Sequence, residues 1–75
     1  MTLPTAQALA DLAEIQDMAR GTIGMAVIAM MRSAEPISRA AIEAFLADIA
    51  AERRTQEGLA PFMAAGALRF IATLR

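Results

Sequence analysis

The chain contains no cysteine, no histidine and no lysine, and neither tryptophan nor tyrosine, among its 75 residues. Without cysteine it can form no disulfide and no thiolate metal site, and without histidine only carboxylates remain as metal ligands. The nearest approach to a carboxylate site is the set Asp11, Glu14 and Asp17, whose spacing is typical of a solvated helix face. We therefore predict no metal and no other cofactor.

The chain also has no large excess of positive or negative charge. Its seven arginines are nearly balanced by eight acidic residues, which gives a formal net charge of −1. Proteins that bind nucleic acid usually present a strongly basic face, so we expect this chain to bind neither nucleic acid nor an anionic membrane. One alternative stays open, a DNA-binding regulator whose basic face forms on dimerisation from Arg32, Arg39, Arg53 and Arg54.

The sequence has no Ser–His–Asp set, no glycine-rich phosphate loop and no nucleophile beside a base, so we predict that it is not an enzyme. Its longest apolar run, Gly21–Met31, is well short of the ~20 residues that cross a bilayer. No basic segment followed by a continuous apolar stretch precedes Gly21, so we expect no secretory signal and a cytoplasmic protein.

Hydrophobic spacing predicts an all-α fold of three helices in a single domain over residues 1–75. The first helix is expected at about 5–32, with Thr2 or Thr5 as its N-cap. Pro36 ends it, because the residue before a proline avoids the α region. The second is expected at about 38–54, with Ser38 as N-cap, and the third at about 59–74. The inward stripe of the first helix is predicted to be Leu9, Leu12, Ile15, Ala19, Ile23, Val27 and Met30.

The second helix is conventionally amphipathic, and its apolar stripe matches one on the third helix. The predicted core between these two helices consists of Ile42, Phe45, Leu46, Ile49, Met63, Ala67 and Phe70. On the outer side of the second helix, Glu43, Asp48 and Glu52 alternate with alanines. Small side chains would let another helix approach closely, so we predict that these three acids face a partner protein.

The first helix differs from the second, because its run 21–31 is apolar on every side. A helix that is apolar all round must be covered all round, and a chain this short has little material for that cover. We therefore predict that a second copy supplies it, so that the three-helix protomer forms a helical homodimer. The interface is assigned to Met18, Met25 and Ile28, with Leu68 from the back of the third helix.

Between Thr22 and about Ile71 the chain carries several short motifs whose order and spacing resemble those of a known bacterial family. They are Ile23-Gly24, Ala26-Val27, Met30-Met31-Arg32-Ser33, Ile37-Ser38-Arg39, the spaced Ile42 and Leu46, and Ala67-Leu68-Arg69-Phe70-Ile71. In these positions the chain resembles the small bacterial biofilm-development and acid-resistance regulators, also described as two-component-system connector proteins. It departs from them at Ala34, where such proteins often carry glycine, and at Pro36.

The resemblance implies an all-helical homodimer without catalytic residues. Such a dimer would bind other regulators, such as sensor kinases, and influence biofilm and stress programmes. We therefore expect a small non-enzymatic regulator that acts by protein–protein contact. The alternatives are the DNA-binding transcriptional regulator described above and a structural assembly subunit or secretion chaperone.

Overall fold

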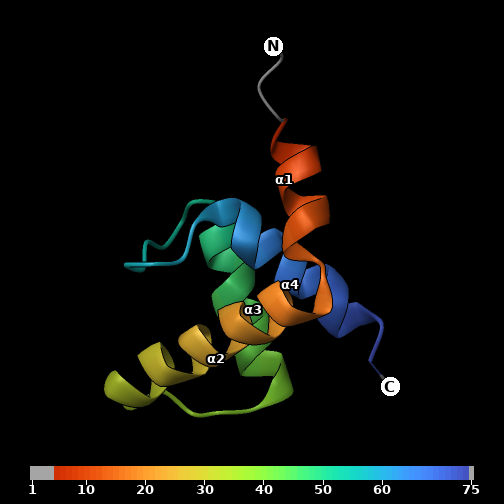
Figure 1. The fold of residues 1–75 in the computed structure, drawn as a ribbon. Coiled ribbons are helices and arrows are strands. Elements are labelled where there is room, and N and C mark those ends of the chain that lie inside the picture. The colour runs from red at the N-terminus through yellow and green to blue at the C-terminus, as the bar shows by residue number, and fades with distance from the viewer. Residues whose placement is uncertain (1–4, 75) are drawn as a thin grey trace.

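The computed structural model describes residues 5–74, which form four α-helices and no strand. They are α1 (Ala6–Ala13), α2 (Gln16–Arg32), α3 (Arg39–Ala50) and α4 (Pro61–Ala72). Helix α4 is the central element, because it packs against each of the other three (Figure 1). The all-helical class is confirmed, whereas the count of three helices is wrong. No helix within residues 5–74 has the length and apolarity needed to cross a membrane.

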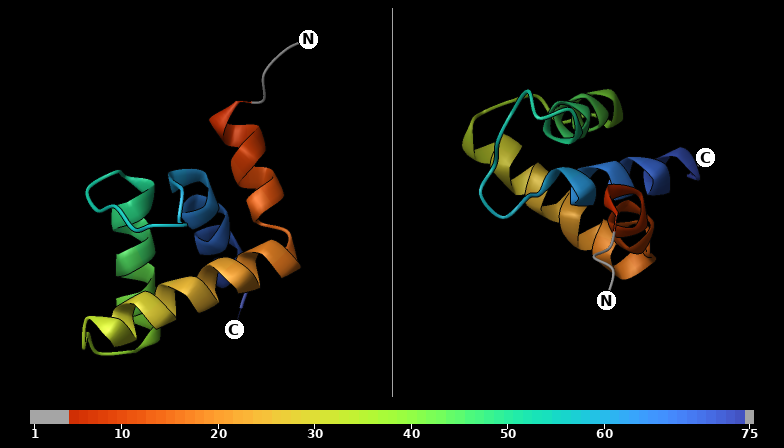
Figure 2. Two further views of the ribbon diagram at one scale, coloured as in Figure 1. Left: turned by 60° about the vertical axis from the view of Figure 1, so that its left-hand side comes forward. Right: turned by 90° about the horizontal axis from the view of Figure 1, so that it is seen from above.

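The extra helix arises from a break in the predicted 5–32 segment. Ile15 has an extended ψ of 135°, so α1 ends at Ala13 and α2 starts at Gln16 in a different direction (Figure 2). The bend lets both segments pack on α4: α1 does so through Ala10 and Ala13, which are buried. Leu12 and Ile15, which a straight helix would turn inward, are 54% and 59% exposed.

Helices α1 and α3 begin at side-chain caps that the sequence predicts. The Thr5 hydroxyl accepts a hydrogen bond from the Ala8 N–H at 3.1 Å, and the Ser38 hydroxyl accepts one from Ala41 at 3.0 Å. Both caps satisfy amide groups that have no partner inside the helix. Thr2, the other predicted cap, lies outside the described residues.

Helices α2 and α3 end in the same way, with a non-glycine residue in the left-handed region. At the end of α2, Ala34 has a φ of 54°, and the Glu35 N–H donates to the Met30 carbonyl at 2.9 Å. At the end of α3, Glu52 has a φ of 60°, and the Arg53 N–H donates to the Asp48 carbonyl at 2.8 Å. This is the Schellman pattern, which usually places glycine at that position. The second predicted helix therefore ends at Ala50 and does not reach residue 54.

The core lies where α2, α3 and α4 meet. Its buried members are Ala26, Ala29, Met30, Phe45, Leu46, Ile49, Leu59, Ala64, Ala67 and Ile71. Ile23, Ile42 and Met63 are partly buried and pack against this cluster. Of the predicted α3–α4 core, only Phe70 stands apart, because it is half-buried and outside the cluster.

Candidate interaction surface

One side of α2 carries apolar side chains that the other described residues leave exposed. Met18, Met25 and Ile28 are 44%, 39% and 52% exposed, and they follow the three-and-four spacing of a single helix face. Gly21 lies between them, and a Cβ added there would meet nothing within 4 Å. We call Met18, Gly21, Met25 and Ile28 the open face of α2.

The opposite side of α2 is buried against the other helices and is also mostly apolar. Ala19, Ala26 and Met30 are at most 1% exposed. The buried Thr22 is accommodated because its hydroxyl donates to the Met18 carbonyl one turn earlier, at 2.9 Å. Helix α2 is thus apolar on both sides, and residues 5–74 cover only one of them.

The loop between α3 and α4 forms one border of the open face. A Cβ added at Gly58, whose φ is 83°, would lie 2.8 Å from the Met25 methyl carbon, so Met25 rests on this glycine. Beside this contact is a groove of about 230 Å³, lined by Met25, Ile28, Ala29, Arg32, Gln56 and Glu57. This contact is not visible in the sequence, because Gly58 is typical of a turn but does not indicate what the turn touches.

Leu68, the fourth residue of the predicted dimer interface, has a different environment. It is half-buried and packs against the core cluster of its own chain. Packing within the chain accounts for its apolar character, so it is not part of the open face.

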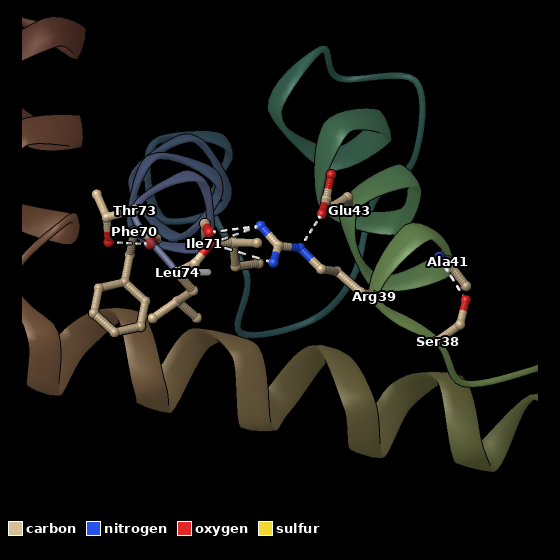
Figure 3. Close-up of polar contacts among 8 residues, drawn as sticks. All are labelled: Ser38, Arg39, Ala41, Glu43, Phe70, Ile71, Thr73 and Leu74. Carbon is tan, nitrogen blue, oxygen red and sulfur yellow. Dashed lines mark hydrogen bonds and ion pairs between the residues drawn. The ribbon is translucent and has the colours of Figure 1, made fainter.

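The acids predicted to face a partner do not form a continuous acidic face. Glu43 pairs with Arg39 at 2.8 Å (Figure 3), and Asp48 pairs with Arg53 at 3.2 Å. Glu52 is exposed but follows the end of α3, in the left-handed turn. The outer side of α3 therefore presents two neutralised acids among the exposed Ala40 and Ala44.

Arg39 also closes the C-terminal end of α4. Its guanidinium donates to the carbonyls of Ile71 at 2.9 Å and Leu74 at 3.3 Å (Figure 3). The last carbonyls of a helix have no partner within it and attract cations. Arg39 thus joins the start of α3 to the end of α4 and is occupied within the chain.

Arg54 is occupied in a similar way. It donates two hydrogen bonds to the Glu35 carboxylate, at 3.0 and 2.8 Å, and its guanidinium lies 4.2 Å from the centre of the Phe45 ring. The hydrogen bond from Arg54 lowers the pKa of Glu35 below its ordinary value. Of the four arginines of the proposed basic face, Arg39, Arg53 and Arg54 are therefore paired with acids of the same chain.

The remaining acids of α1 and α2 are separated by the break at Ile15. Asp11 pairs with Arg69 of α4 and so helps to hold α1 in place. Within residues 5–74, no three acids gather closely enough to hold a metal ion.

No family model, curated protein or solved structure matches this chain.

Proposed function

We propose that this chain is a small non-enzymatic regulator that works as a homodimer and acts by contact with another protein. The observation that carries the proposal is the open face of α2. An exposed apolar face bordered by polar residues is typical of a protein interaction site.

The distribution of exposed apolar side chains supports this proposal. Within residues 5–74, eight large apolar residues are exposed, and four of them lie on α2: Met18, Met25, Ile28 and Met31. Scattered exposed apolar residues need no explanation, but a cluster on one helix does. A second copy of a chain this small would also enlarge a core that is near the lower limit for stability.

The proposed external partner is another regulatory protein. The resemblance to connector proteins points to a component of two-component signalling, such as a sensor kinase, in biofilm or stress regulation. The surface assigned to this contact is the outer side of α3, with Glu43, Asp48 and the neighbouring Glu52. Its exposed alanines would allow a helix of the partner to approach closely.

The DNA-binding alternative is less well supported by the side chains. Each phosphate contact requires a free cation. Arg39, Arg53 and Arg54 are engaged by Glu43, Asp48 and Glu35, and dimerisation would double acids and bases alike.

A capture experiment with a matched variant tests the function. The wild-type chain, Ala44→Arg on the outer side of α3, and Ala72→Arg at the exposed end of α4 are immobilised and exposed to lysate at ~0.15 M salt, with DNA footprinting in parallel. We expect a regulatory protein that binds wild type and Ala72→Arg but not Ala44→Arg. A sequence-specific footprint without any captured protein would instead favour the DNA-binding alternative.

A further inference from the structure

The open face of α2 is complementary to itself when two copies run in opposite directions. Large side chains occupy positions 18, 25 and 28, and a glycine occupies position 21. In an antiparallel pair whose midpoint falls at position 23, Met25 of each copy faces Gly21 of the other. In the same register, Met18 of each copy faces Ile28 of the other.

The open space above Gly21 has no explanation within the protomer. Glycine inside a helix costs roughly 1 kcal/mol relative to alanine. Elsewhere in this chain a close contact accounts for such a glycine, since a Cβ at Gly66 would meet Ala13 at 2.5 Å. At both Gly21 and Gly24 nothing lies within 4 Å of an added Cβ, but of the two only Gly21 lies on the open face, among its large exposed side chains, where a second copy can use the space. Met25 touches Gly58 of its own chain with its methyl group but is still 39% exposed, and it is this exposed part of Met25 from a second copy that would face the space.

Charge selects the antiparallel direction. Asp17 lies in the first turn of α2 and Arg32 in the last, and both are exposed. Within residues 5–74, neither forms an ion pair. Antiparallel copies bring Asp17 of one near Arg32 of the other at both ends, and they also oppose the two helix dipoles. Parallel copies would place like charges side by side.

We infer that the occupant of the open face is the same face of a second copy, with the two α2 helices antiparallel and Met25 of each resting on Gly21 of the other. This inference rests on the homodimer of the proposed function and adds its direction and register. Other protomer surfaces, including α3, are left free for a different partner.

Because the chain contains no cysteine, single cysteines report the pairing directly. The Met18→Cys and Ile28→Cys variants are prepared, and one of them carries a tag that makes its mass distinguishable. Each variant is then oxidised by itself, and the two are also oxidised together as a mixture. In the antiparallel pair, equivalent positions 18 lie about 15 Å apart along the axis at a rise of about 1.5 Å per residue. A disulfide needs Cα atoms within about 7 Å, so only the mixture should cross-link. Met18→Cys mixed with Ala44→Cys is the control and should stay uncross-linked.

A second variant tests the register. Gly21→Leu should leave the protomer helical, because the space around Gly21 is open, and should weaken dimerisation about tenfold or more by overpacking the interface. Ala44→Leu, a substitution at an exposed position on α3, should leave the dimer unchanged.

The outcomes separate this inference from the proposed function. Cross-linking of each variant with itself would show a parallel pair and overturn the inference. A dimer seen by light scattering that neither cross-links nor responds to Gly21→Leu would place the interface elsewhere and leave the homodimer standing. A wild-type monomer would overturn both.

Discussion

At the scale of single residues, Phe45 combines burial with a charged neighbour. It is 3% exposed, and the Arg54 guanidinium covers one face of its ring. We expect Phe45→Ala to lower the free energy of unfolding by ~3–5 kcal/mol, most of what a small domain has. Phe70→Ala should cost clearly less, because that ring is half-buried and lies outside the core cluster. Denaturant titration of both variants measures how much unfolding free energy each one loses. Equal losses in the two variants would contradict this prediction.

The ion pair between Glu35 and Arg54 predicts a pH dependence. The hydrogen bond from Arg54 lowers the pKa of Glu35 from its ordinary value of 4.5, while desolvation acts in the opposite direction. A carboxyl whose pKa is lowered on folding stabilises the folded state above its unfolded pKa. That contribution is therefore present at neutral pH and is lost as the pH falls from 4.5 through the lowered value.

Comparison with Glu35→Gln measures this contribution. We expect wild type to be the more stable at about pH 7, and the difference to shrink as the pH falls to about 3. Glu57→Gln removes the same charge from an exposed residue that forms no ion pair within residues 5–74, and it serves as the control. A gap between wild type and Glu35→Gln that stays constant with pH would contradict the assignment.

At the scale of elements, the docking of α1 depends on Gly66 of α4. A Cβ at this position would lie 2.5 Å from both the Cβ and the carbonyl carbon of Ala13. Helix propensity alone would favour alanine by up to ~1 kcal/mol. We expect the opposite sign: Gly66→Ala should lower the melting temperature and expose α1 to proteolysis, because Ala13 has to move away.

Gly24→Ala is the matched control for this prediction. It lies in α2 with nothing within 4 Å of an added Cβ, so helix propensity should dominate there. We expect Gly24→Ala to raise the melting temperature or leave it unchanged. A Gly66→Ala variant that is also stabilised would mean that α1 does not depend on this close contact.

At the scale of the whole molecule, the chain is predicted to be a dimer that depends on Met25. Met25→Glu would place a charge in the centre of the proposed interface, where burying it without a partner is costly. We expect light scattering to show the dimer for wild type and a species near the 7.9 kDa of one chain for the variant. Ile37→Glu, also an exposed apolar position but outside α2, should remain dimeric. A dimeric Met25→Glu variant with an unchanged melting temperature would contradict the interface.

What the sequence by itself determined about this protein is local. Ser38 marks the start of α3 because capping acts within one turn. The third predicted helix, about 59–74, is correct in kind but is shorter at both ends, since α4 runs from Pro61, where a proline suits the first turn, to Ala72. The stripe Phe45, Leu46 and Ile49 predicted a buried side because helical spacing brings these residues together whatever packs on them. The two-sided apolar character of α2 was also visible, and the open face is its structural counterpart.

The tertiary structure decided what depends on contacts distant in the sequence. The break at Ile15 follows from docking α1 on Gly66 of α4, a contact that no spacing within residues 5–32 encodes. The early end of α3 depends on a left-handed Glu52, a residue type that seldom signals such a turn. The sequence offered Arg39 and Arg54 for a basic face, whereas the fold places them on the end of α4 and on Glu35. A side chain's partner is set by where the helices pack, and that is fixed only once the whole core has formed.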